Sequence, residues 1–497
     1  MGIVKGSNIN AVASPTKATL ASNFIDHINS DFTQQYLPEL IAEEAEVFGN
    51  RSVAGFLSLV GAEEPMASDS VVWSEQGRLH LSYTAIQTTD GNFNVVGTGD
   101  FSGTGATLVP HGVRVGDTIV VTDGDATVKA YVSAADQSAG TFTAHPFEFD
   151  TFANATNNVL TITAETGANE VTAADYVKIF VYGSMYQKGT TGRGEGLNPS
   201  FKSFSNTPII LKDKFEVSGS DASQIGWVEV SGEEGQSGYL WYLKAEGDTR
   251  RRFMDYCEMS MVEAVKKASN ANANVPYGSE GLFAAIEDRG IVASSMLDNG
   301  TTADLADFDT ILKELDKQGA IEENMLYLNR DTALNVDDML ASINGYAGTG
   351  SAANAASFGV FENNADMALN LGFSGFRRGS YDFYKSDWKY LNDGSTYGAM
   401  TDTTASTSDT LGDGKVNGVL IPAGVSSVYD QQLGRNLKRP FLHVRYRASQ
   451  TESRLMKTWV TGSVGAATSD LDAMEVNYLS ERCLVVQGAN NFVLFRK

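Results

Sequence analysis

The stretch that decides the fold is QSGYLWYLKAEGDTRRRFMDYCEMSMVEAVKKA, residues 236–268. Met254, Cys257, Met261 and Val265 recur in it at spacings of three, four and four, which places them on one face of an α-helix. Charged side chains cover much of the rest: Arg250, Arg251, Asp255, Glu258, Glu263 and Lys266. An Asn/Ala tract and Pro276 end the helix. The sequence therefore predicts one long central helix between two stretches of glycine-rich β sequence.

The β sequence before this helix contains a separate β unit. Between residues 88 and 182 the candidate strands are FNVV, ATLV, RVGDTIVV, ATVKAYVSA, GTFTAHPFEF, NVLTITAE and YVKIFVY, separated by Gly-containing turns. Seven short strands in about 95 residues predict a small barrel or sandwich. We expect residues 201–219 to pair with residues 71–87, which gives a long β-hairpin that carries the barrel near its tip.

Helices and strands alternate after the central helix. Residues 282–290, 306–319 and 331–345 have helical patterns, and MLYLN, FRRGSYDFYKS and GVLIPAG have strand patterns. The tail from Pro440 is rich in strands and ends on NFVLF, so we expect the C-terminus to be tied into a sheet. At the other end, residues 1–22 are small and polar like an extended arm, and residues 22–48 have a helical pattern. The overall class predicted is α+β.

Composition excludes several classes of protein. The net charge of −24 argues against tight binding of nucleic acid over the whole surface, because phosphate neutralisation needs concentrated cations. Cys257 and Cys483 are too few and too far apart for a disulfide framework or a zinc site, so two buried free thiols are expected. No secretion signal and no apolar run long enough to span a membrane is evident, so we expect synthesis in a cytoplasm and no membrane association.

Motifs of catalysis are missing from the sequence. The five histidines lie far apart, and none sits in a metal-binding pattern. GTGDFSG at 97–103 lacks the third glycine of a dinucleotide site, and more β sequence follows it. Paired carboxylates such as Glu63-Glu64 are common in so acidic a chain and do not by themselves make an acid–base pair. We predict no enzyme activity, no cofactor and no metal.

Two groups of cations stand out in this acidic chain. Arg250, Arg251 and Arg252 are consecutive on the central helix. Around the last part of the chain lie Arg435, Lys438, Arg439, Arg445, Arg447, Arg454 and Lys457. A local basic strip suits an acidic patch on another copy of the same chain, and we predict that these residues make intersubunit contacts. Contact with DNA and a simple solvated face are the alternatives.

The order of these parts resembles the major capsid proteins of tailed bacteriophages, which have the Hong Kong 97-type fold. The closing run YLSERCLVVQGANNFVLFRK and the helical segment after the arm also look like capsid proteins of crAss-like phages. The resemblance implies an N-terminal arm, an extended β-hairpin loop, a peripheral domain with a long spine helix, and an axial domain. On this chain it places the arm at 1–61, the extended loop at 62–218 with the inserted barrel at 88–182, the spine helix at 219–274, the axial domain at 275–440 and the closing peripheral strands at 441–497.

The function that the resemblance implies is self-assembly into hexamers and pentamers of an icosahedral shell around double-stranded DNA. It further implies a place in the virion, assembly in the host bacterial cytoplasm, and portal, scaffolding and decoration proteins as partners. Two alternatives stay open. One is a β-rich polysaccharide-binding or glycoside-hydrolysing protein, with Trp227, Trp241 and Trp388 as sugar-stacking residues. The other is a phage tail tube or sheath subunit.

Overall fold

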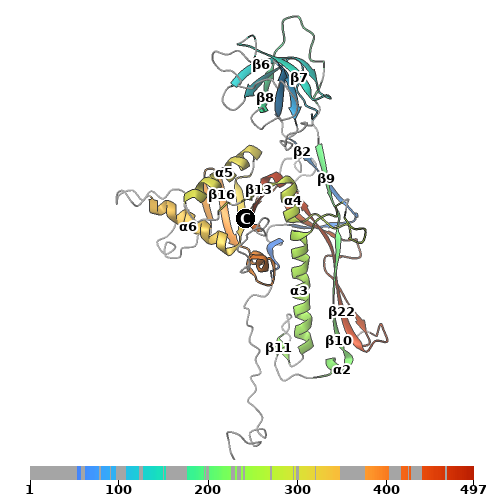
Figure 1. The fold of residues 1–497 in the computed structure, drawn as a ribbon. Coiled ribbons are helices and arrows are strands. Elements are labelled where there is room, and N and C mark those ends of the chain that lie inside the picture. Colours follow the sequence, from blue (N-terminus) through green and yellow to red (C-terminus); the bar gives the residue numbers. More distant parts are fainter. Residues whose placement is uncertain are drawn as a thin grey trace, which may run out of the picture. The chain divides into compact units, whose positions relative to one another are not determined.

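The structure is a computed structural model that describes most of residues 53–496. The longer gaps in this description are residues 97–107, 153–175, 225–229, 232–236, 347–374, 402–415 and 427–438, with shorter breaks elsewhere. The chain divides into two compact units: Met1–Asp69 with Thr207–Lys497, and Ser70–Asn206. We call them the main unit and the barrel unit, and Figure 1 labels elements of both.

The first sheet of the main unit is built around a long strand near the C-terminus. This strand, β22 (Ala473–Val486), pairs antiparallel along one side with β10 (Ile209–Ser218). Its other side pairs with two further strands in succession, and the first of these pairs parallel with β1. These strands are β20 (Leu442–Arg447), β21 (Lys457–Gly462) and β1 (Ala62–Met66). Segments from the beginning, middle and end of the chain therefore share one sheet.

A single long helix covers one face of this sheet. In Figure 1, α3 (Trp241–Glu263) runs alongside β10 and β22, as the contacts between these elements require. Phe253 and Cys257 of the helix form a buried cluster with Val476 and Tyr478 of β22, and the Phe253 and Tyr478 rings stack at 5.8 Å. The predicted long central helix is confirmed, although it begins five residues later and ends five residues earlier than the 236–268 stretch.

The buried face of α3 differs from the predicted one. Cys257 and Met261 are buried as predicted, but Met254 is 42% exposed, and Val265 is 68% exposed and lies beyond the end of the helix. The buried positions step by four residues from Phe253 through Cys257 to Met261. Met254 lies about 100° around the helix from Phe253, which turns it away from the sheet. The hydrophobic pattern alone did not distinguish these two neighbours.

A second sheet of the main unit has six strands. In spatial order they are β13 (Ile291–Ser294), β23 (Val493–Arg496), β17 (Val416–Pro422), β14 (Glu323–Leu328), β16 (Tyr381–Asp387) and β15 (Gly375–Arg378). Two helices, α5 (Thr302–Gln318) and α6 (Arg330–Tyr346), join this sheet in one buried core that includes Phe308, Val336 and Phe383. The predicted helices at 306–319 and 331–345 are thereby confirmed.

The last strand, β23, lies in the second sheet, between β13 and β17. The prediction placed all of residues 441–497 with the closing strands beside the spine helix, so this assignment needs correction at its end. The physical cause is a change of direction after β22: Gly488 adopts φ 59°, and a short turn, η4 (Ala489–Asn491), follows. That the C-terminus ends in a sheet is confirmed.

A shared core joins the two sheets of the main unit. It contains Met261 of α3, Val444 of β20 and Leu494 of β23, together with Ile286 and Leu391 from two short helices. The short elements of the main unit are α4 (Leu282–Arg289), α7 (Lys389–Asn392), η3 (Tyr397–Thr401), α2 (Gly219–Ala222), β11 (Val230–Ser231), β12 (Ser237–Gly238), β18 (Val425–Ser426) and β19 (Arg439–Pro440). The main unit is thus one packed body around two sheets.

The barrel unit contains a two-stranded ribbon and a closed barrel. The ribbon pairs β2 (Val71–Gln76) with β9 (Phe201–Asn206) antiparallel. The barrel strands, in order around it, are β3 (Ser82–Thr89), β4 (Asn92–Val96), β7 (Thr141–Pro146), β6 (Thr127–Asp136), β5 (Asp117–Thr122) and β8 (Tyr176–Ser184). Its interior is filled by apolar side chains, with Phe93 stacked on Phe142 at 5.2 Å.

The predicted α+β class and the predicted small barrel are confirmed, with three differences in detail. Residues 82–87 belong to the barrel, so the ribbon is shorter than expected. The candidate strand ATLV contributes a single bridge, Val96 to Leu108. The candidate strand at 158–165 and the helix at 22–48 lie outside the described residues. Within the described part of the chain, no helix is long and apolar enough to cross a membrane.

Candidate intersubunit-contact site

The three predicted arginines of the central helix lie on α3. Arg250 and Arg251 are half-buried, and each already has an interaction partner. Arg252 is 53% exposed, and its Nη2 lies 3.5 Å from Oδ2 of Asp213 on β10. An ion pair this exposed contributes about 0–1 kcal/mol, so it does little to hold the Arg252 side chain in place.

The predicted cations of the closing strands have acidic partners within the same chain. Nη2 of Arg445 lies 2.7 Å from Oε2 of Glu64, its register partner across the parallel pairing of β20 with β1. Arg447 donates from Nη1 to the carbonyl of Ala67 at 2.9 Å, and its Nη2 contacts Asp69. Both arginines therefore fasten β1 and the residues that follow it to the first sheet.

A buried carboxylate lies behind these arginines. Glu481 of β22 is 4% exposed and receives two guanidinium groups, Arg447 Nε at 3.1 Å and Arg454 Nη1 at 2.5 Å. The backbone N–H of Glu481 also donates to the carbonyl of Arg454 at 2.9 Å. A buried carboxylate is stable as an ion only when such partners surround it. Arg447 and Arg454, two of the predicted contact cations, therefore neutralise a buried acidic group of their own chain.

The remaining predicted contact residues are only partly covered by the structure. Arg439 is in β19, and nothing is described of its side chain, whereas Arg435 and Lys438 lie outside the described residues. Arg445 and Arg447 lie together on β20, and Arg252 pairs elsewhere, with β10. Their part in contacts between copies stays a prediction.

Sequence reasoning missed two carboxylates of α3 that hold the segment 53–57. Oδ1 of Asp255 accepts hydrogen bonds from the first two backbone N–H groups of that segment, at 3.0 and 2.8 Å. Glu258 accepts from the next three, at 2.6, 2.6 and 3.2 Å. The segment begins a helical turn, whose first N–H groups have no partner within the helix. Two carboxylates supply those partners and a favourable charge.

The carboxylate of Glu258 is held in a partly dry setting. Burial raises the pKa of Glu258, and the three N–H donors oppose that change only in part. The spacing of three residues between Asp255 and Glu258 put both on one helix face, which was visible in the sequence. Their partners are about 200 positions away, and no local pattern connects the two segments.

Aromatic packing locks the same segment from the other side. The ring of Phe56 stacks on Trp388 with 4.3 Å between centroids and meets the edge of Tyr327 at 4.8 Å. Trp388 is therefore 4% exposed inside the core, which corrects its predicted place in a sugar-binding groove. Trp241 is 44% exposed at the start of α3, and Trp227 lies outside the described residues. Because Trp388 is buried in the core, it does not share an exposed groove with Trp241.

No cluster of three or more metal-ligating side chains occurs in the part of the chain that the structure describes. Cys257 and Cys483 are both free and buried, as predicted. Burial raises the pKa of the Cys483 thiol to about 12, so it stays protonated at neutral pH and is a poor nucleophile. The described chemistry is that of packing and ion pairing.

No protein-family model matches the sequence, and no curated protein sequence matches it. The chain is similar to a solved structure from Mycobacterium phage Ogopogo, with TM-score 0.36 and 10% identity over 94% of this chain and 99% of that one. It is similar to the capsid structure of the cyanophage P-SCSP1u, with TM-score 0.32 and 11% identity over 63% and 80%. For the mature capsid of bacteriophage PhiM1 the values are 0.31, 9%, 63% and 79%. TM-scores at this level do not establish a shared fold.

Proposed function

We propose that this chain is a structural shell subunit of a tailed bacteriophage, a major capsid protein of the Hong Kong 97 type. The observation that carries the proposal is the path of the chain around the first sheet. It leaves this sheet through β1, forms the ribbon and barrel of residues 70–206, and returns to the same sheet through β10 beside α3. A long excursion that starts and ends on a sheet backed by one long helix is the layout that the sequence resemblance implied.

In this role the protein acts by binding copies of itself. Hexamers and pentamers form through the region of the second sheet, and the excursion and the N-terminal residues contact neighbouring subunits. Many separate contacts per subunit sum to a stable shell even where each interface is small. The shell encloses double-stranded DNA without sequence-specific binding, and the net charge of −24 disfavours adhesion of DNA to its wall. Portal, scaffolding and decoration proteins are the further partners, and the virion is the location.

Electron microscopy of the purified full chain tests this proposal. The protein is expressed in bacteria alone and together with its neighbouring phage genes, and then imaged by negative stain and cryo-electron microscopy. Closed shells, or rings of five and six copies, are the expected result. Helical tubes would instead support the alternative function of a phage tail tube or sheath subunit. A monomer under every condition would refute self-assembly.

A charge reversal tests the predicted contact residues. Arg252→Glu changes a half-exposed side chain whose ion pair within the chain is weak, so the fold should persist while assembly falls. Arg252→Lys, which keeps the positive charge at this position, is the matched control. Equal assembly of the two variants and the wild type would remove Arg252 from the interface.

A further inference from the structure

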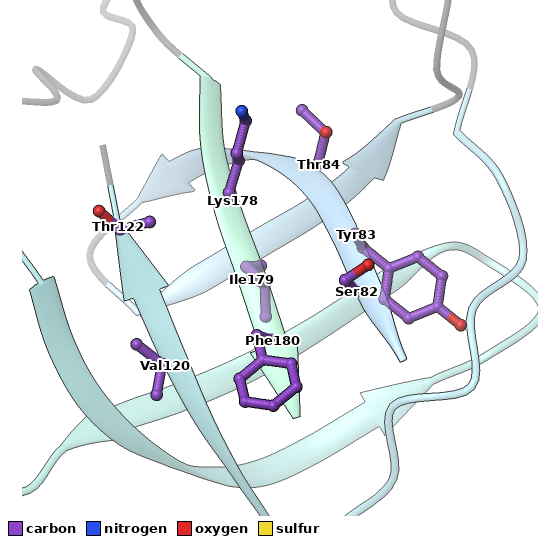
Figure 2. Close-up of a pocket in the computed structure, with 8 residues that line it drawn as sticks. All are labelled: Ser82, Tyr83, Thr84, Val120, Thr122, Lys178, Ile179 and Phe180. Carbon is purple, nitrogen blue, oxygen red and sulfur yellow. The ribbon is translucent and has the colours of Figure 1, made fainter. Parts of the chain in front are cut away.

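β10 is an edge strand of the first sheet of the main unit. It pairs with β22 on one side, and none of the described strands pairs with its other side. The strands of the barrel have no such open edge, because the barrel is closed. Figure 2 shows this for β8, which carries Lys178 and Phe180 and has β3 on one side and β5 on the other. The outer edge of β10 is therefore a place where a further strand can add to the sheet.

The backbone groups of alternate residues of β10 point to this outer edge. In an antiparallel strand the N–H and C=O of one residue point to the same side, and the side alternates along the chain. The N–H of Glu481 on β22 donates to the carbonyl of Arg454 at 2.9 Å, away from β10, so its register partner Ile210 directs its own groups outward. In agreement, the N–H of Lys214 donates to Oδ1 of Asp213 at 2.8 Å and not to β22. The outward residues are therefore Ile210, Lys212, Lys214, Glu216 and Ser218.

Charge is the only protection that this edge has. Natural edge strands are blunted by proline, by a β-bulge, by short length or by charged side chains, especially lysine. β10 is ten residues long, contains no proline and pairs with β22 without a register shift. Lys212 and Lys214 are exposed charges of the protective kind, but Glu216 follows them on the same face of the strand. The edge therefore repels a partner strand only in registers that place like charges opposite each other.

The charge pattern of β10 fits a second copy of the same strand. Two copies related by a two-fold axis pair antiparallel, and outward residues of one copy must lie opposite outward residues of the other. Among the registers that overlap at least three outward residues, one places Lys214 opposite Glu216 of the second copy and, by symmetry, Glu216 opposite Lys214. The other registers place Lys212, Lys214 or Glu216 opposite itself, or Lys212 opposite Lys214. β10 is therefore complementary to itself in a single register.

We propose that β10 pairs with β10 of a second copy in this register and joins the first sheets of the two copies into one continuous sheet. The Lys214 and Glu216 side chains are 46% and 48% exposed, so both can reach a partner. Within the chain, Lys214 Nζ lies 2.8 Å from Oε2 of Glu216 and 3.0 Å from Oε1 of Glu475, and the second copy adds a further carboxylate to this lysine. On the face of the sheet that α3 covers, the same register places Phe215 opposite its own copy, and cross-strand aromatic pairs are stabilising.

The proposal rests on the proposed shell function, because it names one contact between copies of a protein that self-assembles. The two can nevertheless fail separately. Shells that form without this strand pairing would remove the contact and leave the shell function, whereas paired copies that form no shell would do the reverse.

Disulfide mapping of the full chain tests the register. Lys214→Cys and Glu216→Cys are made as separate proteins, mixed and mildly oxidised, in solution and in any assembled particles. Cα atoms of residues opposite each other in a hydrogen-bonded antiparallel pair lie about 5.5 Å apart, within the range of a disulfide. This mixture should give a covalent dimer, because the natural cysteines are buried and do not compete. The matched mixture of Lys212→Cys with Glu216→Cys joins diagonal positions about 7–8 Å apart and should give about tenfold less.

Charge substitutions test the pairing without cysteines, with sedimentation equilibrium as the measurement of association. Lys214→Glu replaces two favourable cross-strand pairs with two like-charge pairs and should weaken association about tenfold or more. Addition of Glu216→Lys reverses both charges and should restore association to within about threefold of the wild type. Lys212→Glu makes the same charge change on the same strand, opposite Ser218, and should have an effect of less than about threefold.

Three results would overturn the proposal. The first is a covalent dimer from the 212 and 216 mixture in preference to the 214 and 216 mixture. The second is equal weakening by Lys212→Glu and Lys214→Glu, or a double variant that does not recover. The third is the absence of cross-linked dimers from the 214 and 216 mixture both in solution and in assembled particles.

Discussion

The two units of this molecule differ in how their segments are distributed along the sequence and in how far charged contacts join those segments. The barrel unit is one continuous stretch, Ser70–Asn206, closed around an apolar interior. The main unit is assembled from segments that are distant in sequence, and buried or half-buried charges join several of them in addition to its apolar cores. Examples are Glu258 with residues 53–57 and Glu481 with Arg447.

This difference sets how each unit responds to change. Apolar packing is non-directional, and the barrel interior is closed. We therefore expect a substitution in that interior to destabilise the barrel unit and not the main unit. A buried carboxylate with several donors depends on all of its partners, because removal of one partner leaves the remaining groups buried without compensation and costs free energy of unfolding. We therefore expect the barrel unit to unfold as one cooperative body and the main unit to lose particular segments first.

The largest expected effect tests the independence of the barrel. Phe93 is fully buried and packs against Phe142 and Phe152, each at 5.2 Å. Phe93→Ala should lower the free energy of unfolding of the barrel by about 3–5 kcal/mol. Hydrogen-exchange mass spectrometry should show faster exchange in β3 to β8 and unchanged protection in α3 and β22. Loss of protection in both units would contradict the proposed independence, and Phe147→Ala, an exposed ring of the same unit, is the control.

The second effect concerns the buried joint of the main unit. Glu481→Gln removes the charge that two guanidiniums share and should cost about 3 kcal/mol, the lower end for a broken buried pair. The lower end applies because the Arg447 and Arg454 side chains are 28% and 34% exposed. Urea denaturation measures the loss, and exchange should accelerate first in β1. Glu475→Gln, on the same strand but in a more exposed pair with Lys214, should cost about 0–1 kcal/mol.

The barrel unit was largely predictable from sequence because it is one continuous stretch of the chain. Its strands alternate with turn residues within one stretch, so local patterns carry most of the information. Gly91 and Gly140 have φ of 80° and 75° in the turns before β4 and β7, where glycine is the favoured residue. The local patterns did not predict that the barrel is closed, because closure depends on the pairing of β3 with β8 across about 90 residues of intervening chain.

The candidate site was less predictable, because its contacts are long-range. Arg445 and Arg447 were visible as cations, but Glu64 and Glu481, which neutralise them, come from two other segments. A count of local charge therefore did not reveal that Arg445 and Arg447 already pair within the chain, and the predicted contacts of these residues with other copies stay a prediction. The difference between Phe253 and Met254 on α3 was equally invisible, because both neighbours are apolar and only the position of the sheet separates them.

A smaller effect sharpens the account of the main unit. Glu258→Gln replaces one acceptor oxygen with a donor, which leaves at least one N–H of residues 53–57 without a partner. The expected cost is about 1–3 kcal/mol. Amide exchange of Gly55 and Phe56, which donate to different oxygens of Glu258 at 2.6 Å, should accelerate before that of α3 itself. Glu246→Gln on the same helix is the control, and unchanged exchange at residues 53–57 would show that the Phe56 ring alone holds this segment.

The smallest expected effect at neutral pH concerns a buried histidine that makes the stability of the barrel unit depend on pH. His111 is buried, its Nδ1 accepts from the Val113 N–H at 3.2 Å, and its Nε2 therefore carries the proton that it donates to the Thr141 carbonyl at 3.1 Å. Burial lowers the pKa of His111 below its ordinary value of 6.5, although the hydrogen bonds to Thr141 and Val113 oppose this.

At a pH below 6.5 the unfolded chain binds a proton at His111 more readily than the folded barrel does. His111 therefore lowers the stability of the barrel as the pH falls below 6.5, and it has no such effect well above this pH. Urea midpoints of the wild type should decline from about pH 7.5 to about pH 5.5 more than those of His111→Asn, whose amide oxygen accepts the Val113 N–H without titrating. His145→Asn, an exposed position on β7, should follow the wild type. Equal declines of the urea midpoint in all three proteins would mean that protonation of His111 does not destabilise the folded barrel. The barrel unit would then tolerate a buried charge, as the main unit does at Glu481.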